Sequence, residues 1–218
     1  MILVAGGIKG GNGKSTVAVN LAVMRAREGR DVLLVDADDQ ETATDFTVLR
    51  NERLGGEAGY TSVALRGKAI RTEVHRLVPK YDDIIKDTGG RDTTSQRAAM
   101  SVADVYLVPF VPRSFDVWTL ERVAELVEEV QTVHLDLQPF VFLNRADARG
   151  RDNAEAVAYF REFETLEYLD APLGNRKVFA NAAASGLAVV EYRPRDPKAI
   201  AEIERFYESV CDIEVISL

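Results

Sequence analysis

Short apolar runs alternate with amphipathic segments along this chain. Strands that alternate with helices form βαβ units, in which parallel strands lie side by side and helices cover both faces of the sheet. The predicted strands are residues 2–5, 32–35, 84–85, 105–110 and 140–143, and the predicted helices are residues 15–28, 94–102, 115–133, 153–163, 178–185 and 197–210. We therefore expect an α/β fold with a mostly parallel, twisted sheet.

The length of the chain, 218 residues, favours one large domain over two. A typical domain has roughly 150 residues, and no segment here resembles a linker long enough to separate two such units. Residues 51–67 are the least regular part and contain Gly55, Gly56 and Gly59, so we expect a mobile loop over the sheet. Residues 1–218 are accordingly expected to form a single domain.

The net charge of −8 excludes a uniformly basic surface but not a local basic patch. Residues 115–138 and 152–170 each carry a net charge of −5, so the remainder of the chain carries +2. The single cysteine, Cys211, excludes an internal disulfide framework and a cysteine-ligated cluster. No apolar run approaches the roughly 18 residues of a membrane span, and the acidic C-terminal segment would be repelled by anionic lipid. We expect a cytoplasmic protein without membrane contact.

The segment between the first predicted strand and the first predicted helix is rich in glycine and lysine. Its glycines let backbone N–H groups surround an anion, and the helix that follows directs its positive end at the same point. By the pattern G-x-x-x-x-G-K-[ST], Lys14 would reach the β- and γ-phosphates of a nucleotide, and the Ser15 hydroxyl would coordinate Mg²⁺. The chain departs from that pattern at Ile8, where glycine is usual, and adds a second lysine, Lys9. The predicted phosphate-binding residues are Gly10, Gly11, Asn12, Gly13, Lys14, Ser15 and Thr16.

Carboxylates follow two further predicted strands. Asp36 and Asp38 come after the second strand, and Asp87 after the third. Ligands of open parallel sheets lie beyond the carboxyl ends of the strands, so these side chains are expected to meet the phosphate loop. One of the first two can support Mg²⁺ and the other can orient the attacking water, while Asp87 occupies the place of a Walker-B carboxylate. Lys86, inside the third strand, is predicted to lie at a sheet edge or to pair with a carboxylate.

Together these motifs resemble the ParA/MinD superfamily of deviant Walker-A ATPases. The K-G-G-x-G-K-[ST] loop is residues 9–15, the V-D-x-D-x-Q element is residues 35–40, and the D-T-G-G element is residues 87–90. The resemblance continues in residues 103–110, 142–145 and 176–191. It implies a P-loop NTPase fold, an ATPase activity, and ATP and Mg²⁺ as cofactors.

The resemblance also assigns roles to the expected catalytic residues, Lys9, Lys14 and Asp38. Lys9 is the signature lysine, which in this superfamily reaches across a dimer interface to the phosphates of the partner's ATP. Lys14 keeps its phosphate role, and Asp38 positions the hydrolytic water. We therefore expect a homodimer that forms when ATP binds.

The remaining site residues are assigned by the same likeness. Asp36 and Asp87, with Ser15, form the Mg²⁺ shell, and Asn144 reads the adenine edge. Asp39 is a departure, because ParA sequences usually carry proline at this place. It adds a negative charge beside the expected water site.

Several absences narrow the choice within the superfamily. The single cysteine argues against iron-protein and cluster-scaffold relatives, and the chain begins at its first strand without the N-terminal DNA-binding domain of longer ParA proteins. The likeness is to short ParA proteins, which drive plasmid or chromosome segregation through ATP-regulated, non-specific DNA binding and a ParB-like or cargo adaptor that stimulates hydrolysis. The alternatives are a positioning ATPase for a protein cargo and a P-loop biosynthetic ligase of the dethiobiotin or cobyrinate type.

Non-specific DNA binding, and with it a nucleoid-associated location, needs clustered basic side chains that neutralise phosphates. The candidates are Arg145, Arg149, Arg151, Arg176, Lys177, Arg193, Arg195 and Lys198.

Overall fold

The computed structural model describes the chain except for residues 92, 113–116, 148–150 and 216–218. Its sheet has the strand order β3-β2-β4-β1-β5-β6-β7, and β8 pairs with the end of β6. Every pairing among the described strands is parallel, which agrees with the mostly parallel sheet predicted from the sequence. The strands are β1 (Ile2–Ala5), β2 (Val32–Ala37), β3 (Thr61–Ala64), β4 (Asp83–Thr88), β5 (Val105–Phe110), β6 (Gln138–Ala146), β7 (Glu167–Tyr168) and β8 (Leu173–Gly174).

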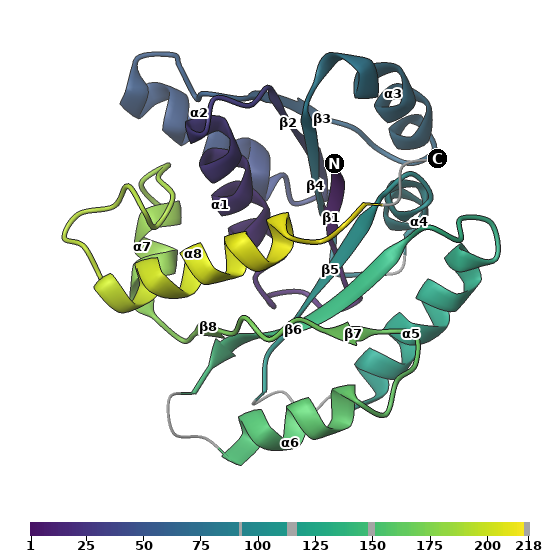
Figure 1. Ribbon diagram of the computed structural model, residues 1–218. Helices are drawn as coiled ribbons and strands as arrows, with labels where there is room; N and C mark the ends of the chain where they lie inside the picture. The colour runs from purple at the N-terminus through teal and green to yellow at the C-terminus, as the bar shows by residue number, and fades with distance from the viewer. Residues whose placement is uncertain (92, 113–116, 148–150, 216–218) are drawn as a thin grey trace.

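Helices cover both faces of this sheet (Figure 1). They are α1 (Lys14–Arg27), α2 (Thr42–Leu54), α3 (Ala69–Leu77), α4 (Thr94–Met100), α5 (Val117–Gln131), α6 (Arg151–Phe160), α7 (Lys177–Ala183) and α8 (Pro197–Cys211), with a short 3₁₀ turn at Val78–Lys80. The five predicted strands and six predicted helices are present, with ends that differ by at most three residues. Positions 115–116 of the predicted fifth helix lie outside the described residues.

The expectation of a loop over residues 51–67 is wrong at both ends of that segment. The helix α2 continues to Leu54, and residues 61–64 form the edge strand β3. Gly55 ends α2 in a left-handed conformation with φ of 71°, which glycine adopts without a steric penalty. Gly55 therefore marks a helix end, whereas residues 55–60, with Gly56 and Gly59, connect α2 to β3 without regular secondary structure.

The two faces of the sheet separate the core into two layers. Leu3 and Ala5 of β1 point to one layer, which α1, α2, α7 and α8 cover, whereas Val4 points to the other layer, which α3 to α6 cover. Strands buried on both faces carry apolar side chains at successive positions. This double burial is why the strands are visible in the sequence as short apolar runs.

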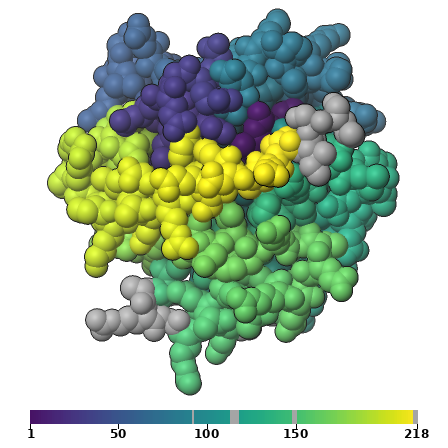
Figure 2. Space-filling view, in the orientation of Figure 1, coloured from purple at the N-terminus to yellow at the C-terminus, as the bar shows by residue number. Residues whose placement is uncertain are grey.

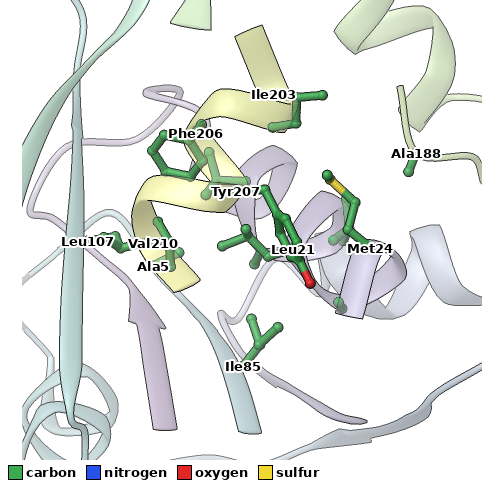
Figure 3. Close-up of a cluster of buried hydrophobic side chains, with 14 of the residues drawn as sticks. Ala5, Leu21, Met24, Ile85, Leu107, Ala188, Ile203, Phe206, Tyr207 and Val210 are labelled. Atoms are coloured by element: carbon green, nitrogen blue, oxygen red, sulfur yellow. The ribbon is translucent and has the colours of Figure 1, made fainter. Parts of the chain in front are cut away.

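The last helix, α8, joins the two ends of the chain in one core. Asp196 caps α8 by accepting hydrogen bonds from the backbone N–H groups of residues 198 and 199, both at 3.1 Å. Phe206 of α8 packs with Leu21 of α1 and Leu107 of β5 in the cluster of Figure 3. The space-filling view shows α8, in yellow, lying directly against the purple N-terminal region (Figure 2). This packing fixes α1, whose first turn borders the site described below.

Lys86 occupies neither of the two predicted environments. Its strand, β4, lies between β2 and β1, so the residue is central in the sheet, and its side chain is fully buried. The ammonium donates a hydrogen bond of 2.6 Å to the carbonyl of Ala99, near the end of α4, where helix carbonyls lack intrahelical partners. Burial lowers the pKa of Lys86 to about 7, although the nearby carboxylate of Asp104 opposes that shift. The lysine therefore ties β4 to α4.

Candidate functional site

The loop between β1 and α1 is shaped as an anion site. Gly13 precedes α1 with φ of 94°, a left-handed conformation that turns the chain into the helix. The first turn of α1 contains no acidic residue, so nothing opposes the positive end of the helix dipole. Gly13 also has no room for a side chain, because a Cβ there would collide with the amide of Asn144. The backbone N–H groups at this helix start are thus directed at one point.

A cavity of about 590 Å³ opens beside this loop. It is bordered by the carboxyl ends of β1, β2, β4 and β6 and by the start of α4, as ligand sites of open parallel sheets are. Its lining residues are Gly10, Gly11, Gly13, Lys14, Ser15, Thr16, Ala37, Asp38, Asp39, Gln40, Thr42, Gly89, Gly90, Arg91, Thr93, Ser95 and Arg145. The structure therefore brings three separate sequence motifs to one cavity, which we call the nucleotide pocket.

Lys14 is the buried cation of the nucleotide pocket. Its Nζ donates a hydrogen bond of 3.0 Å to the carbonyl of Lys9, and its side chain is almost completely buried. Burial lowers the pKa of Lys14, while the carboxylates of Asp87 and Asp38 oppose the shift by stabilising the charged form. A buried ammonium between carboxylates and helix N–H groups is suited to bind phosphate oxygens.

Asp87 is the buried carboxylate beside Lys14. Burial raises its pKa to about 7, and the charges of Asp36 and Asp38 add to that shift. The Ser15 hydroxyl and the Lys14 ammonium oppose the shift, yet neither carboxylate oxygen has a well-formed hydrogen bond within the part of the chain that the structure describes. Mg²⁺ prefers oxygen ligands and is bound by one or two carboxylates together with phosphates and water. The orphaned oxygens of Asp87 and the Ser15 hydroxyl fit this ion.

Asp36 and Asp38 lie close together but have different surroundings. Asp36 is fully buried, and its Oδ2 accepts two hydrogen bonds of 2.8 Å from the N–H and hydroxyl groups of Thr44 at the start of α2. Asp38 is half-buried, lines the nucleotide pocket and faces Gly89. Asp39, beside it, is 94% exposed and lies 3.4 Å from the guanidinium of Arg66. Asp38 and Asp39 thus both line the nucleotide pocket, and Asp38 is the less exposed of the two.

Asn144, expected at the adenine edge, contacts the phosphate loop instead. Its side-chain nitrogen donates a 2.5 Å hydrogen bond to the carbonyl of Asn12, and its side-chain oxygen accepts one of 3.0 Å from the N–H of Arg145. Asn144 is buried and is not among the lining residues, whereas Arg145 is. The side-chain amide of Asn144 therefore links the phosphate loop, at Asn12, to the backbone of Arg145.

Lys9 is not among the lining residues of the nucleotide pocket. Together with Ile8 and Asn12 it borders a smaller cavity formed with residues 108–110 and the first turns of α5. Its carbonyl accepts the hydrogen bond of Lys14, as described above. The backbone of Lys9 therefore borders Lys14 and Gly90, which line the nucleotide pocket.

Two arginines of the nucleotide pocket, Arg91 and Arg145, were not expected there from the sequence. Arg91 follows the D-T-G-G element directly, so its proximity to that motif is a signal in the sequence. Arg145 was expected among the DNA-binding candidates, and no local pattern indicates that it lines the pocket.

The other DNA-binding candidates lie outside the pocket. Arg176 forms an ion pair of 2.5 Å with Glu202, which fixes its guanidinium. Arg149 lies outside the described residues. Exposed side chains are found at Arg151, Lys177, Arg193, Arg195 and Lys198. These five remain available for phosphate contacts.

Neither a membrane span nor a protein-only metal cluster is found in the described part of the chain. No helix there has the length and apolar character needed to cross a bilayer. No group of three or more His, Cys, Asp or Glu side chains there is arranged to hold a metal ion. An ion in the nucleotide pocket would therefore need phosphate or hydroxyl oxygens to complete its shell.

The fold and the loop define a P-loop NTPase. The family described as "CobQ/CobB/MinD/ParA nucleotide binding domain" matches residues 2–190, and the chain belongs to it. This confirms the ParA/MinD resemblance on which the site predictions were built.

Individual relatives add detail. The chain is 30% identical, over 211 residues, to Maintenance of carboxysome distribution protein A of Gloeobacter kilaueensis, with 94% of this chain and 89% of that protein covered. It is 26% identical over 229 residues to the chromosome-partitioning ATPase Soj of Thermus thermophilus, with 88% of each covered. Cobyrinic acid a,c-diamide synthase of Mycobacterium smegmatis shares the fold, with a TM-score of 0.78 at 18% identity over 96% of this chain and 93% of that one. That structure holds an ATP analogue and magnesium, the pair expected here from the sequence.

Proposed function

We propose that this chain is an ATPase that positions a protein cargo through an ATP-controlled cycle of dimerisation. The observation that carries the proposal is the likeness to a carboxysome distribution protein along 94% of this chain. The nucleotide pocket supplies the chemistry that such a cycle needs. We further propose that residues 1–218 act as one domain, because Leu3 and Val210 share one hydrophobic cluster.

The reaction is hydrolysis of ATP by water to ADP and phosphate. Lys14 and the N–H groups at the start of α1 would hold the β- and γ-phosphates, and Ser15 and Asp87 are the residues that would hold Mg²⁺. Asp36, expected in the same Mg²⁺ shell, accepts hydrogen bonds from Thr44 and from the N–H of Asp38. Bound there, Mg²⁺ neutralises charge on the phosphate oxygens. Asp38 accepts a hydrogen bond from the attacking water and orients it in line with the bond that breaks. Lys14, Ser15 and Asp38 line the nucleotide pocket, and Asp87 interacts with Ser15 and Lys14 beside it.

Lys9 connects nucleotide binding to dimerisation. Lys9 does not line the nucleotide pocket of its own chain, which suits a lysine that acts on the pocket of a partner. ATP brings concentrated negative charge that a second Lys9 can neutralise only in the dimer, so ATP favours the dimer and hydrolysis releases it. Non-specific DNA retains the dimer through contacts with exposed basic side chains such as Arg193 and Arg195. An adaptor protein on the cargo stimulates hydrolysis.

Light scattering tests the cycle directly. The wild-type chain should be monomeric with ADP and dimeric with ATP. Lys9→Ala should bind ATP with unchanged affinity but stay monomeric, and Lys68→Ala, which changes an exposed lysine before α3, should behave as wild type. An ATP-dependent dimer in Lys9→Ala would refute the role of Lys9.

The second candidate is DNA partition, which the likeness to Soj favours. Both candidates share the ATP cycle and DNA retention, so the cargo separates them. Deleting the gene in its host should disperse or cluster a protein assembly while plasmid retention stays normal. Loss of plasmids with normally distributed protein assemblies would favour partition and overturn the cargo proposal.

Arg193→Glu combined with Arg195→Glu should weaken ATP-dependent DNA retention in either case, as a low-salt mobility shift would show.

A further inference from the structure

Gln96 of α4 is a buried polar side chain that the proposed reaction does not use. It is fully buried, and so is Tyr106 of β5, whose hydroxyl lies 2.8 Å from the Gln96 amide. Burying an amide costs free energy unless its donors and its acceptor are paired. The partners of this amide therefore show which parts of the molecule it holds together.

The Gln96 amide joins three segments around the nucleotide pocket. Its nitrogen faces the backbone carbonyls of Arg91, Gly89 and Gly7, at 2.8, 3.3 and 3.3 Å. Carbonyls only accept hydrogen bonds, so the nitrogen donates to them, and the amide oxygen accepts from the Tyr106 hydroxyl. One side chain thus links the loop after β4 to the start of the phosphate loop and to β5.

The loop that Gln96 holds is the D-T-G-G element, residues 87–90, and it borders both reactive parts of the pocket. A Cβ on Gly90 would collide with the backbone of Gly10 in the phosphate loop. A Cβ on Gly89 would lie 3.1 Å from a carboxylate oxygen of Asp38. The carbonyl that receives the Gln96 hydrogen bond therefore belongs to the residue that faces Asp38.

The backbone of Gln96 is fixed independently of its side chain. Its N–H donates a hydrogen bond of 3.1 Å to the hydroxyl of Thr93, which caps the start of α4. Near the other end of the helix, the Lys86 ammonium donates to the carbonyl of Ala99 at 2.6 Å. Loss of the amide should therefore release the D-T-G-G loop while α4 keeps its place.

We propose that Gln96 is a positioning residue for ATP hydrolysis, because its amide holds the D-T-G-G loop where Asp38 can orient the attacking water. The inference rests on the proposed function, since hydrolysis is the step that it serves. Gln96 is not among the lining residues of the nucleotide pocket, so it acts through Gly89. Its loss should slow hydrolysis and spare ATP binding, which is assigned to Lys14 and the start of α1.

The test measures single-turnover phosphate release and, by calorimetry, the affinity for a non-hydrolysable ATP analogue. Gln96→Met keeps the length of the side chain but removes its hydrogen bonds, so release should slow about tenfold or more while affinity stays within about twofold of wild type. Tyr106→Phe should slow release less, because the three carbonyls keep their donor. The matched control is Gln131→Met, since Gln131 bonds the carbonyl of Leu137 at the end of α5 and should affect neither quantity.

Gln96→Glu adds a signature that depends on the hydrogen bond itself. A carboxylate cannot donate to the three carbonyls, whereas the protonated acid donates one hydrogen bond. Burial favours the protonated form, which gains further as the pH falls. The rate of Gln96→Glu relative to wild type at the same pH should therefore rise toward low pH, and the relative rate of Gln96→Met should stay constant. Circular dichroism verifies that each variant is folded under the assay conditions.

Three outcomes would overturn the inference. Unchanged phosphate release in a folded Gln96→Met would remove the residue from the reaction, and equal losses of rate and affinity would show that it supports nucleotide binding instead. A relative rate of Gln96→Glu that does not change with pH would contradict donation to the loop, and this measurement decides alone if Gln96→Met does not fold. A wild-type chain that binds the analogue but releases no phosphate from ATP would instead refute the proposed function, and the inference with it.

Discussion

The two ends of the nucleotide pocket are built differently. At the phosphate end Lys14 and Asp87 are buried; Lys14 begins α1, which follows β1, and Asp87 belongs to β4, which pairs with β1. At the other end, where the sequence predicts the adenine edge and which we call the base end, Arg145 is exposed and is held by a β-bulge between β6 and β8 and by the Asn144 amide. Charges are thus desolvated where the reaction is proposed to occur and hydrated where the ligand is only held.

This difference ranks the effects of mutation. Interactions of charged groups are stronger when the groups are buried, because less water competes with them. Removing one partner from a buried charged pair also leaves the other uncompensated. We therefore expect large effects at the phosphate end and small ones at the base end, and the following variants test that ranking.

Lys14→Ala should have the largest effect. The substitution removes the buried ammonium that is proposed to contact the phosphates, and it leaves Asp87 without the opposing charge of Lys14. Affinity for ATP should fall about 100-fold or more, with loss of hydrolysis. Calorimetric titration measures the affinity, and Lys68→Ala serves as the matched control. Retained affinity for ATP would refute the phosphate role of Lys14.

Asp38→Ala should affect turnover alone. Positioned carboxylates that handle the proton of the attacking water contribute about 100-fold or more to rate. Single-turnover phosphate release should slow by that factor, while ATP affinity stays within about threefold of wild type. Asp39→Ala is the control, because Asp39 is adjacent yet 94% exposed and lies near Arg66. A larger rate loss in Asp39→Ala than in Asp38→Ala would show that Asp39, and not Asp38, orients the attacking water.

The fold could be predicted where burial and pattern agree. The doubly buried strands appear as apolar runs, whereas α2 lacks an apolar stripe at helical spacing. Its buried positions include Thr47 and Arg50, and its exposed positions include Val48 and Leu49. Arg50 is buried because it forms an ion pair of 2.7 Å with Glu191, a residue 141 positions later in the sequence. Such a pair is a tertiary effect that local periodicity cannot indicate.

The same distinction, between what a local sequence pattern indicates and what tertiary contacts decide, applies to the nucleotide pocket. Lys14, Ser15 and Asp87 each belong to a short motif next to a strand end, so their proximity follows from the pairing of β1 with β4. The place of Arg145 depends instead on the register between β6 and β8, a strand of only two residues. The amide of Asn144 has its place for a similar reason, since its partner, Asn12, is 132 positions away. Contacts of this kind are set by the folded chain.

Gly13→Ala should disturb the contact between the phosphate loop and Asn144, which lies between the phosphate end and the base end of the nucleotide pocket. Its φ of 94° is unfavourable for alanine, and the added methyl group would collide with the Asn144 amide. The free energy of unfolding should fall by about 1–3 kcal/mol in chemical denaturation. Gly10→Ala is the matched control, because that Cβ would meet no atom within 4 Å, and a change below about 0.5 kcal/mol is expected. Equal losses in both variants would show that the Asn144 contact does not constrain the loop.

Asn144→Ala should have the smallest effect and decides what this residue does. Loss of its hydrogen bond to the Asn12 carbonyl loosens the phosphate loop, at a cost typical of one or two neutral hydrogen bonds. Affinity should fall about fivefold for the non-hydrolysable ATP analogue and by the same factor for inorganic triphosphate, which lacks the sugar and base. Asn181→Ala, an exposed asparagine of α7, should leave both affinities unchanged.

The comparison of the two ligands is informative because the two proposed roles predict opposite results. A residue that reads the adenine edge affects only the ligand that has a base, whereas a residue that braces the loop affects both. A loss of affinity confined to the ATP analogue would show that Asn144 contacts the base, as the sequence predicts. Equal losses for the two ligands would show that Asn144 holds the phosphate loop through Asn12 and would assign it to the phosphate end of the nucleotide pocket.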